Sequence, residues 1–297
     1  MGSPCLLYLY CSSKEQFERV ASQSVARVNE LEAHYSRYLA DSLLSDINSH
    51  AGTDKRFTLT DEFWTLLQYA NTAHAISDGL FDITSGVLRK VWDFNNGQPP
   101  AIAKINSTLE LVGWSKIVLD QNYFHLPLAG MELDFGGIVK EYAADLVVEM
   151  LRQSGINHGL VDMGGDIAVI GPHPDNSPWQ VAISDPDFPE QAIATIPLMA
   201  GGLASSGDYQ RFIVLNDERY CHILNPKTGW PVKGLAAVSV WAPQCVVAGT
   251  VATIAMLKGD VEGEKWLQDV GCNYVTVNRS GIVNCYPNAL VRMSSHL

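Results

Sequence analysis

The sequence predicts an α+β protein with mixed or antiparallel sheets and packed helices, and two observations carry this prediction. Residues 14–33 and 59–76 place apolar side chains at helical spacing in the first part of the chain. Beyond residue 158, short apolar runs alternate with Gly, Asp and Pro turn residues, which is typical of short strands. Because strands and helices do not alternate regularly, a repeating βαβ sheet is disfavoured.

The first part of the chain is expected to hold two long helices joined by loops. Ser and Asp residues punctuate the stretch between these helices, which suits loops and helix caps. Thr60 and Glu62 mark the start of the second helix. In order, we expect a strand at 5–10, a helix at 14–33, loops and caps at 35–48, a helix at 59–76, a turn cluster at 77–86, a short helix at 87–94 and a loop at 95–101.

The second part is expected to be rich in strands. Gly164 and Gly165 interrupt an apolar run and are expected to form a turn within it. In order, we expect strands at 117–119 and 123–127, a helix with Lys140 in its first turn, a broken strand over 158–171, short strands within 178–186, 194–201, 202–215, 219–226 and 236–243, helices at 246–258 and 262–270, and strands near 273–277 and 282–284.

The length of 297 residues is enough for one large core or two modest ones, and we expect one domain over residues 1–297 with two lobes whose boundary the sequence does not assign. Apolar residues make up 47% of the chain and charged residues 18%, as in ordinary globular proteins. A net charge of −12 argues against a nucleic-acid-binding surface, which needs clustered cations. An anionic ligand must therefore be held by local donors or by a metal ion.

The six cysteines form no CxxC pair, and we expect most of them to be buried thiols in a reducing compartment, with disulfide pairing as the alternative. Met1 is followed almost at once by a strand-like run, so we expect no secretory signal. The longest apolar run, residues 236–257, is interrupted by Pro243 and Gln244, so we read it as a strand, a turn and a helix and expect no transmembrane segment. The expected location is cytoplasmic, or periplasmic if a leader has been removed.

Seven clusters place Gly, Asp, Ser or Thr at a predicted turn beside a strand or helix end. One such cluster is usually only turn chemistry. Seven in a fixed order are harder to dismiss. They are MGSP (1–4), YSRYLADSLLSDIN (35–48), SDGLFDITSG (77–86), LDFGGIVKEYAADL (133–146), VDMGGDIAVIG (161–171), SSGDYQRF (205–212) and HILNPKTGWPV (222–232).

This ordered set resembles the FAD:protein FMN transferases, the ApbE-type flavin transferases, over nearly the whole chain. The resemblance implies a two-lobed α+β fold with FAD in the cleft between the lobes. It implies a reaction in which Mg²⁺ assists cleavage of the FAD pyrophosphate, FMN moves to a Thr or Ser hydroxyl of another protein, and AMP leaves. The implied acceptors are subunits of membrane-bound redox complexes and some flavin-dependent reductases.

The resemblance also implies residues that contact the flavin nucleotide. Tyr38 could equally be a half-buried core residue, and Asp82 could be only a turn or cap acid. Ser206 and Asp208, in an S-G-D motif, could be only a turn that ends a strand. The implied set is Met1, Tyr38, Leu80, Phe81, Asp82, Asp134, Lys140, Ser206, Asp208, Ile223 and Leu224.

The stretch LDFGGIVKEYAAD resembles the family pattern L-D-x-G-G-x-x-K-G-Y-x-x-D. Asp134 would accept hydrogen bonds from the nucleotide, and the Gly136–Gly137 pair would let the backbone and a helix N-terminus approach anionic oxygen. Lys140 would place a cation near the pyrophosphate, and the carbonyl of Gly137 would be a metal ligand. The chain departs from the pattern at Glu141, where Gly is common.

His222 is the candidate general base, because hydroxyl transfer needs a proton acceptor and imidazole titrates near neutral pH. A lone His is more often structural. This one matches the family motif H-I-[IL]-[DN]-P in the sequence HILNP, where Ile223 or Leu224 would pack on the nucleotide.

The metal helix of the family reads A-D-A-x-x-T, and here the segment is VVAGTVATIAMLKG. Thr253 matches the metal-binding Thr, whereas Gly249 occupies the Asp position. Mg²⁺ is usually held through at least one carboxylate, so the site is expected to be weakened. Three hypotheses follow: an active flavin transferase, a protein that binds FAD with little or no transfer, and a pyrophosphatase that hydrolyses FAD to FMN and AMP.

Overall fold

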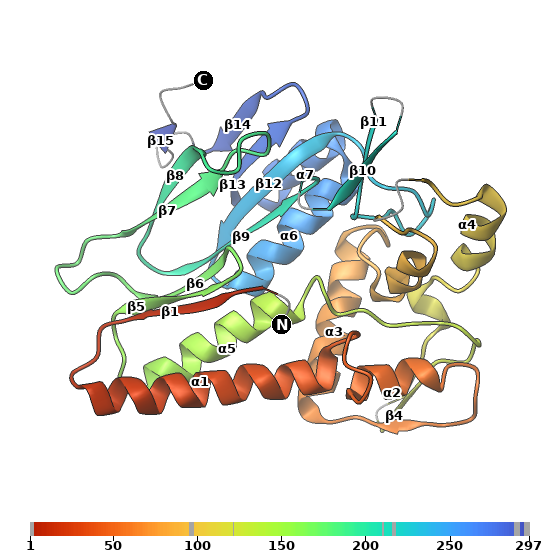
Figure 1. Cartoon of the computed structure of the whole chain (residues 1–297), viewed down its shortest axis with the longest axis horizontal. Coiled ribbons are helices and arrows are strands. Elements are labelled where there is room, and N and C mark those ends of the chain that lie inside the picture. The colour runs from red at the N-terminus through yellow and green to blue at the C-terminus, as the bar shows by residue number, and fades with distance from the viewer. Residues whose placement is uncertain are drawn as a thin grey trace. The chain divides into compact units, whose positions relative to one another are not determined.

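The computed structural model describes residues 3–94, 98–120, 122–209, 211–215, 218–287 and 292–293. The chain forms two compact units, which are described one at a time (Figure 1). Unit 1 comprises residues 1–31, 139–209 and 234–297, and unit 2 comprises residues 32–138 and 210–233. The first boundary lies in helix α1 (Lys14–Tyr35) and the second at the start of α5 (Val139–Gln153).

Unit 1 is built on a seven-stranded sheet in which every neighbouring pair is antiparallel. Gly164 and Gly165 have φ values of 66° and 93° and close a hairpin between β5 and β6, as two-residue turns with positive φ do. The predicted break at this pair is confirmed. The strand order is β1 (Cys5–Leu9), β5 (Gly159–Met163), β6 (Asp166–Gly171), β9 (Gly201–Gly207), β12 (Leu235–Ala242), β13 (Asn273–Asn278) and β14 (Val283–Tyr286).

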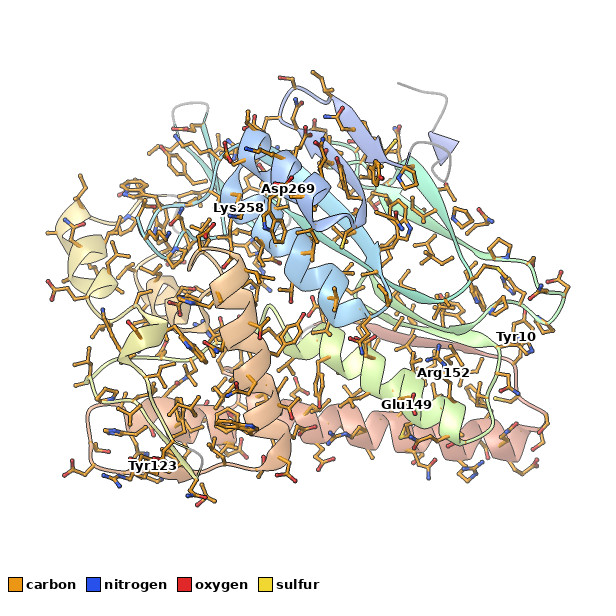
Figure 2. All side chains as sticks on the ribbon, turned by 180° about the vertical axis from the view of Figure 1, so that it is seen from behind. Tyr10, Tyr123, Glu149, Arg152, Lys258 and Asp269 are labelled. Atoms are coloured by element: carbon orange, nitrogen blue, oxygen red, sulfur yellow. The ribbon has the colours of Figure 1, made fainter. Side chains whose placement is uncertain are left out.

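Three helices cover one face of this sheet. Helix α5 packs on β5 and β6, α6 (Cys245–Lys258) packs on β9, β12 and α5, and α7 (Asp260–Val270) packs on α6 and β13 (Figure 1). Arg152, labelled on α5 in Figure 2, fixes the end of that helix to the sheet. Its guanidinium donates to the carbonyl oxygens of Val169 at 3.0 Å and Ile170 at 2.9 Å.

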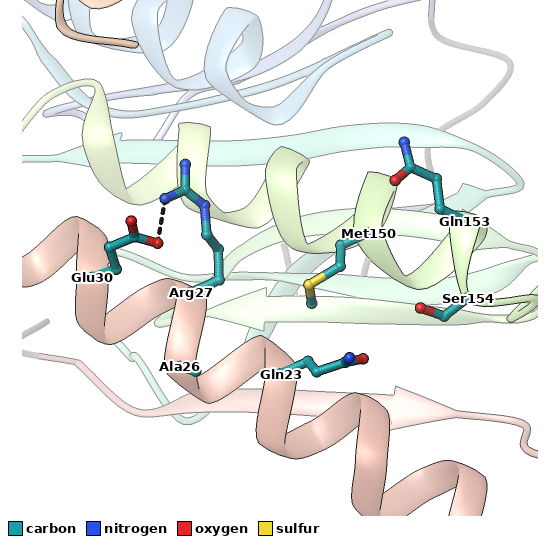
Figure 3. Close-up of a pocket in the computed structure, with 7 residues that line it drawn as sticks. All are labelled: Gln23, Ala26, Arg27, Glu30, Met150, Gln153 and Ser154. Atoms are coloured by element: carbon teal, nitrogen blue, oxygen red, sulfur yellow. Dashed lines mark hydrogen bonds and ion pairs between the residues drawn. The ribbon is translucent and has the colours of Figure 1, made fainter. Parts of the chain in front are cut away.

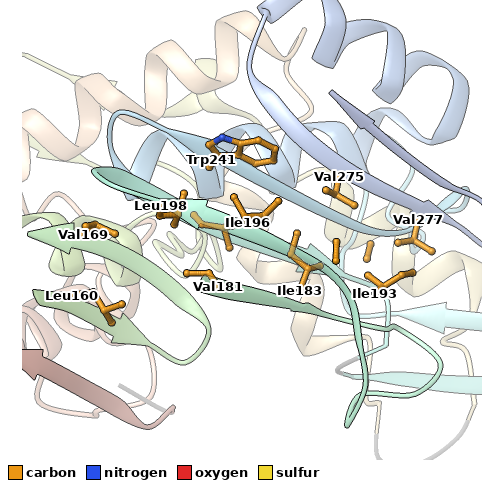
Figure 4. Packing of buried hydrophobic residues seen from close by; sticks show 13 residues of the cluster. Leu160, Val169, Val181, Ile183, Ile193, Ile196, Leu198, Trp241, Val275 and Val277 are labelled. Carbon is orange, nitrogen blue, oxygen red and sulfur yellow. The ribbon is translucent and has the colours of Figure 1, made fainter. Parts of the chain in front are cut away.

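The other face of the sheet forms the core with a second, three-stranded antiparallel sheet, ordered β15 (Arg292–Met293), β8 (Ala192–Leu198) and β7 (Trp179–Ser184). Side chains alternate between the two faces of a strand. Val275 and Val277 of β13 therefore enter this core, while Thr276 between them bonds Glu264 of α7. Figure 4 shows the apolar cluster that joins the two sheets.

Unit 2 packs short helices around aromatic side chains. Phe63, Phe124 and Phe135 are almost fully buried, and the ring centroid of Phe63 lies 5.7 Å from that of Phe124 and 5.9 Å from that of Phe135. The Thr60 hydroxyl caps α3 by accepting from the Phe63 N–H, so the predicted start of that helix is confirmed. The elements are α2 (Leu43–Ser49), β2 (Phe57–Thr58), α3 (Asp61–Ile76), η1 (Ile83–Lys90), α4 (Ile102–Leu109), η2 (Trp114–Lys116), β3 (Val118–Leu119), β4 (Tyr123–His125), β10 (Phe212–Leu215) and β11 (Glu218–Cys221).

The α+β prediction with antiparallel sheets is confirmed, but several local predictions are wrong. Part of the segment predicted as loops and caps, 35–48, is helix α2, because Ser42 caps a turn that buries Leu44 and Ile47. The helix predicted at 87–94 is a 3₁₀ helix that begins earlier, at Ile83, because Asp82 caps it there. Helix α4 and the short strands β2 and β15 were not predicted.

The cysteine prediction is only partly right. Cys221 and Cys245 are buried, whereas Cys5 is exposed and the other three are intermediate. No disulfide joins them within the described residues. Across those same residues, no helix combines the length and the apolar composition needed to span a bilayer.

Candidate active site

The polar centre of unit 1 forms where the start of α5 meets the start of β6. The ammonium of Lys140 makes an ion pair with Oδ2 of Asp166 and lies 3.9 Å from Oε1 of Glu141. The other carboxylate oxygen of Asp166 accepts from the Ser205 N–H at 3.1 Å. One ammonium therefore faces two carboxyl groups in the layer between the helices and the sheet.

The two carboxyl groups of this centre are buried, which disfavours their charged forms. Glu141 is 7% exposed and Asp166 only 2%. Burial, followed by the charge of Asp166, raises the pKa of Glu141 to about 8. Burial alone would lower the pKa of Lys140, but Asp166 and Glu141 outweigh it and raise that pKa above its ordinary value. Lys140 is therefore a permanent cation at this helix N-terminus.

Helix α6 brings its own polar groups to the same layer. The hydroxyls of Thr253 and Ser206 lie 2.9 Å apart. A Cβ atom added at Gly249, one turn before Thr253, would lie 2.8 Å from Cγ and 3.0 Å from Cδ of Glu141. The Glu141 side chain is thus packed directly on the backbone of α6 at the position where the family pattern has Asp.

Asp208 ends strand β9 in a buried position. Its carboxylate pairs with Arg279 at 3.1 Å, and its N–H donates to the carbonyl of Ala236 at 2.9 Å. Burial, then the charges of Asp166 and Asp208, raises the pKa of the neighbouring Tyr209. The Ser206–Asp208 motif therefore has a clear structural role at the end of a strand, in addition to any contact with a ligand.

Asp145 has a structural role that the sequence did not reveal. It is the last residue of the LDFGGIVKEYAAD stretch, and its two carboxylate oxygens accept from the N–H groups of Cys245 and Val246, each at 2.9 Å. Gln244, the N-cap residue of α6, makes no side-chain cap bond. Asp145 of α5 therefore caps α6. The only hint in the sequence is that the N-cap position holds Gln244 and not one of the usual capping residues Ser, Thr, Asp or Asn.

In unit 2, Asp134 is the centre of a charged group. Its Oδ2 lies 2.9 Å from Nη1 of Arg37 and 3.6 Å from Nη1 of Arg89, and its Oδ1 accepts from the Gly136 N–H at 2.8 Å. Burial alone would raise the pKa of Asp134, but Arg89, Arg37 and the Gly136 N–H together lower it. Asp134 is ionised and already paired, so the arginines are the groups left to meet an anion.

Gly137 lies in the turn before α5 and belongs to unit 2. A Cβ atom there would lie 3.3 Å from the ring of Phe81, which is 6% exposed. Phe81 is therefore a packing partner of the Gly-Gly turn. Leu80 is half-buried. Tyr38 is 72% exposed, so the alternative of a half-buried core tyrosine is wrong.

Both carboxylate oxygens of Asp82 accept hydrogen bonds from other residues of unit 2. One carboxylate oxygen accepts from the N–H and hydroxyl of Thr84 at 2.8 and 2.7 Å, and the other accepts from the Trp114 N–H at 3.0 Å. The alternative of a cap acid therefore accounts for Asp82 without a ligand.

His222 follows β11 and is half-buried. Its backbone N–H donates to the carbonyl of Arg211 at 3.0 Å, whereas its ring Nδ1 is buried and has no hydrogen-bond partner among the described residues. Burial first, and then the charges of Arg89 and Arg211, lowers the pKa of His222 to about 4. The imidazole is therefore neutral at pH 7, and its buried Nδ1 has no partner among the described residues.

The two residues after His222 have different surroundings. Leu224 is 8% exposed and packs in the apolar cluster of Leu88, Trp92 and Ile105, so its side chain is part of the core. Ile223 is half-buried, and its carbonyl accepts from the Val232 N–H. Met1, which the resemblance implies as a contact of the nucleotide, lies outside the described residues.

A shallow groove of about 410 Å³ lies between α1 and α5 in unit 1 (Figure 3). An ion pair between Arg27 and Glu30, 2.7 Å long, crosses one part of its wall. None of the predicted site residues lines this groove. The described residues contain no group of three or more His, Cys, Asp or Glu side chains suited to a metal ion.

These features place the chain in the class of α+β proteins with an antiparallel sheet and a charged, glycine-flanked helix start. The ApbE family profile matches residues 1–276, so the chain belongs to the ApbE family. It is 30% identical over 293 residues to the FAD:protein FMN transferase of Klebsiella pneumoniae, with 96% of this chain and 89% of that protein covered. It is also 30% identical over 254 residues to the enzyme of the same name from Haemophilus influenzae, covering 82% and 73%.

Solved structures agree with this assignment. The ApbE protein of Thermotoga maritima matches with a TM-score of 0.88 at 26% identity, over 97% of this chain and 95% of that chain. The apo form of the flavinyl transferase ApbE of Pseudomonas stutzeri matches with a TM-score of 0.86 at 28% identity, over 98% and 94%. The predicted fold class and family are confirmed. The site roles and the FAD cleft between lobes stay predictions.

Proposed function

We propose that this protein is an FAD:protein FMN transferase. It would cleave FAD, attach FMN to a Thr or Ser hydroxyl of a target flavoprotein and release AMP. The observation that carries the proposal is the match along almost the whole chain to transferases of that name. The geometry supports it through cationic groups at glycine-flanked turns and a neutral imidazole with a buried, unpartnered nitrogen.

The transfer requires one bond to form and one to break. The acceptor oxygen bonds to the FMN phosphorus, and the bond from that phosphorus to the bridging oxygen of AMP breaks. The hydroxyl proton must leave, and His222 is the proposed acceptor, because its lowered pKa keeps it unprotonated at neutral pH. The leaving AMP carries the electron pair of the broken bond.

Each unit, taken by itself, carries cations suited to phosphate oxygens. On unit 1, Lys140 and the first N–H groups of α5 form a site suited to phosphate oxygens. On unit 2, Arg37 and Arg89 are the corresponding groups, held in place by Asp134. Exposed Tyr38, beside Arg37, offers an aromatic face for a ring of the nucleotide.

Mg²⁺ would, when bound, offset charge on the phosphates during phosphoryl transfer. The chain offers the carbonyl of Gly137 and the hydroxyl of Thr253 for it, both oxygen donors of the type that Mg²⁺ prefers. Gly249 offers no side chain. The buried Oε2 of Glu141 has no hydrogen-bond partner among the described residues, so an oxygen donor with unused capacity is present in unit 1.

The test is direct. Purified protein is incubated with FAD, Mg²⁺ and an acceptor domain that carries a Thr flavinylation site, and the acceptor is examined by mass spectrometry. The expected result is a covalent FMN adduct, released AMP and no adduct on an acceptor whose Thr is replaced by Val. Absence of the adduct across a metal and pH series would overturn the proposal. AMP formed without acceptor would indicate FAD hydrolysis, and bound FAD without either product would indicate a binding protein.

The location of the reaction is a further part of the proposal. We retain cytoplasmic localisation as the prediction made from the sequence. Fractionation of the native host, followed by detection of the protein in cytoplasmic and periplasmic extracts, would test it.

A further inference from the structure

Glu141 is the most unusual carboxyl group of unit 1. It lies in the first turn of α5, and its side chain is 9% exposed. Its Oε2 meets no N–H or O–H donor among the described residues, and the neighbouring carboxyl group of Asp166 can bond the Glu141 carboxyl only through a shared proton. A buried carboxyl oxygen without a donor is costly unless a proton or a cation satisfies it. Lys140 is shared with Asp166, so one positive charge serves two carboxyl groups.

The surroundings of Glu141 supply further oxygen donors. Its side chain packs on α6 at Gly249, and Thr253 follows one turn later on the same face of that helix. Side chains on a helix lean toward its N-terminus, so the Thr253 side chain leans toward the turn that contains Gly249, on which Glu141 packs. Ser206 bonds Thr253 from the sheet side at 2.9 Å.

We propose that Glu141 supplies the carboxylate that holds a divalent cation together with Thr253, in place of the side chain that Gly249 lacks. The absence of a Cβ at position 249 is what makes room for Glu141, because that atom would lie 2.8 Å from Cγ of Glu141. The acidic ligand of this centre is therefore delivered from α5 across to α6. One carboxylate, a hydroxyl and substrate phosphates form a ligand set that suits Mg²⁺.

This inference deepens the proposed function and rests on it for the identity of the metal. It changes the expectation for Gly249 drawn from the sequence. Adding Asp at that position alone would bring a third carboxyl group against Glu141 and Asp166, and its Cβ would collide with Glu141. Gly249→Asp alone is therefore expected to destabilise the protein.

The test measures Mn²⁺ binding by electron paramagnetic resonance, with and without saturating FAD and with no acceptor present. Glu141→Gln keeps the shape of the side chain and is expected to weaken Mn²⁺ binding by at least about tenfold. Glu149→Gln changes an exposed residue of the same helix, labelled in Figure 2, and is expected to leave binding unchanged. Equal affinity of the wild type and Glu141→Gln, or no Mn²⁺ binding by the wild type, would overturn the proposal.

A pair of exchanged residues keeps the test sharp if a single variant folds poorly. Glu141→Gly is expected to lose Mn²⁺ binding, and the double variant Glu141→Gly with Gly249→Asp is expected to regain it to within about tenfold of the wild type. In crystals soaked with Mn²⁺, an anomalous peak within bonding distance of a Glu141 oxygen is expected. A folded double variant that stays without Mn²⁺ binding would count against the exchange.

The two proposals fail separately. Glu141-dependent Mn²⁺ binding without any FMN transfer would leave the metal site standing and remove the transferase function. FMN transfer with Mn²⁺ affinity indifferent to Glu141 would leave the function standing. In that case the carboxyl group of Glu141 only shares a proton with Asp166.

Discussion

His222 shows how surroundings decide what a side chain offers to chemistry. Burial and then the charge of Arg89 disfavour the imidazolium. Among the described residues, no carboxylate is a cause of the pKa shift, so none offsets these effects. The pKa falls to about 4 from an ordinary 6.5. The neutral ring is the form that can accept a proton.

The pH profile follows from this shift. For the free enzyme, kcat/KM for transfer is expected to be flat with respect to His222 down to about pH 5 and to fall as pH approaches 4, because only then is the base protonated. His222→Asn is expected to abolish the transfer while FAD still binds. A profile with a midpoint near 6.5, or a His222→Asn variant with normal kcat, would contradict the assignment. His50→Asn, at an exposed histidine of the same unit, is the control.

The same shift affects stability. The folded pKa of His222 lies below the unfolded one, so its contribution is fully present above pH 6.5 and is lost as pH falls from 6.5 to about 4. The loss amounts to about 3 kcal/mol when complete. Urea unfolding at pH 7 and pH 4.5 should show a smaller difference in His222→Asn than in the wild type.

Asp134 is a second residue whose neighbours settle its role. Its carboxylate is buried between Arg37 and Arg89, and removing it would leave two cations without their partner. We expect Asp134→Ala to lower the free energy of unfolding by about 2–4 kcal/mol. Asp46→Ala, which removes an exposed carboxylate paired with Lys55, should lose no more than about 1 kcal/mol in the same urea titration. Equal losses of unfolding free energy in the two variants would show that the buried ion pairs of Asp134 stabilise the fold no more than the Asp46 pair does.

At the scale of elements, the start of α6 depends on a residue from another helix. Asp145 of α5 accepts from the first two N–H groups of α6, which no local side chain satisfies. Asp145→Ala is expected to lower the free energy of unfolding by about 1–2 kcal/mol. Gln244→Ala, at the N-cap itself, should change it little, because its side chain makes no cap bond. Thermal unfolding of the two variants side by side separates these outcomes.

The contact of Gly249 in α6 with Glu141 in α5 is expected to reverse the usual effect of a Gly→Ala substitution on helix stability. Ala normally favours a helix by about 1 kcal/mol over Gly. Here Gly249→Ala is expected to destabilise by about 1–3 kcal/mol, because the new Cβ meets Glu141. In a Glu141→Gly background the same substitution should stabilise by about 1 kcal/mol. Additive effects in this double-mutant cycle would show that the two positions do not touch.

These elements also show what the sequence could and could not predict. The long helices, the turn at Gly164–Gly165 and the capped start of α3 follow from local patterns of apolar residues, glycine and hydroxyl groups. Helix α2 is only seven residues long, and its few buried side chains give no periodic signal. The role of Asp145 could not be predicted, because its partners lie one hundred residues further along the chain.

For the whole molecule, the sequence predicted the class of fold and the family, because the ordered motifs extend along most of the chain. It did not predict which face of the large sheet packs in the apolar core and which face carries the polar groups. On β9, Leu203 enters the apolar core with β7 and β8, whereas Ser206 faces α6 and bonds Thr253. The same sheet therefore stabilises the unit with one face and holds its polar centre on the other.

The packing of Glu141 on a residue without a side chain has a consequence for how such chains are read. A motif search that scores each helix separately finds two unrelated deviations from the family pattern, Gly249 in α6 and Glu141 in α5. In space the two deviations fit one another, since the carboxyl group of one fills the vacancy left by the other. If Glu141 is the ligand that we propose, substitutions at these two positions are expected to occur together, and a Gly at position 249 does not by itself predict the loss of a metal.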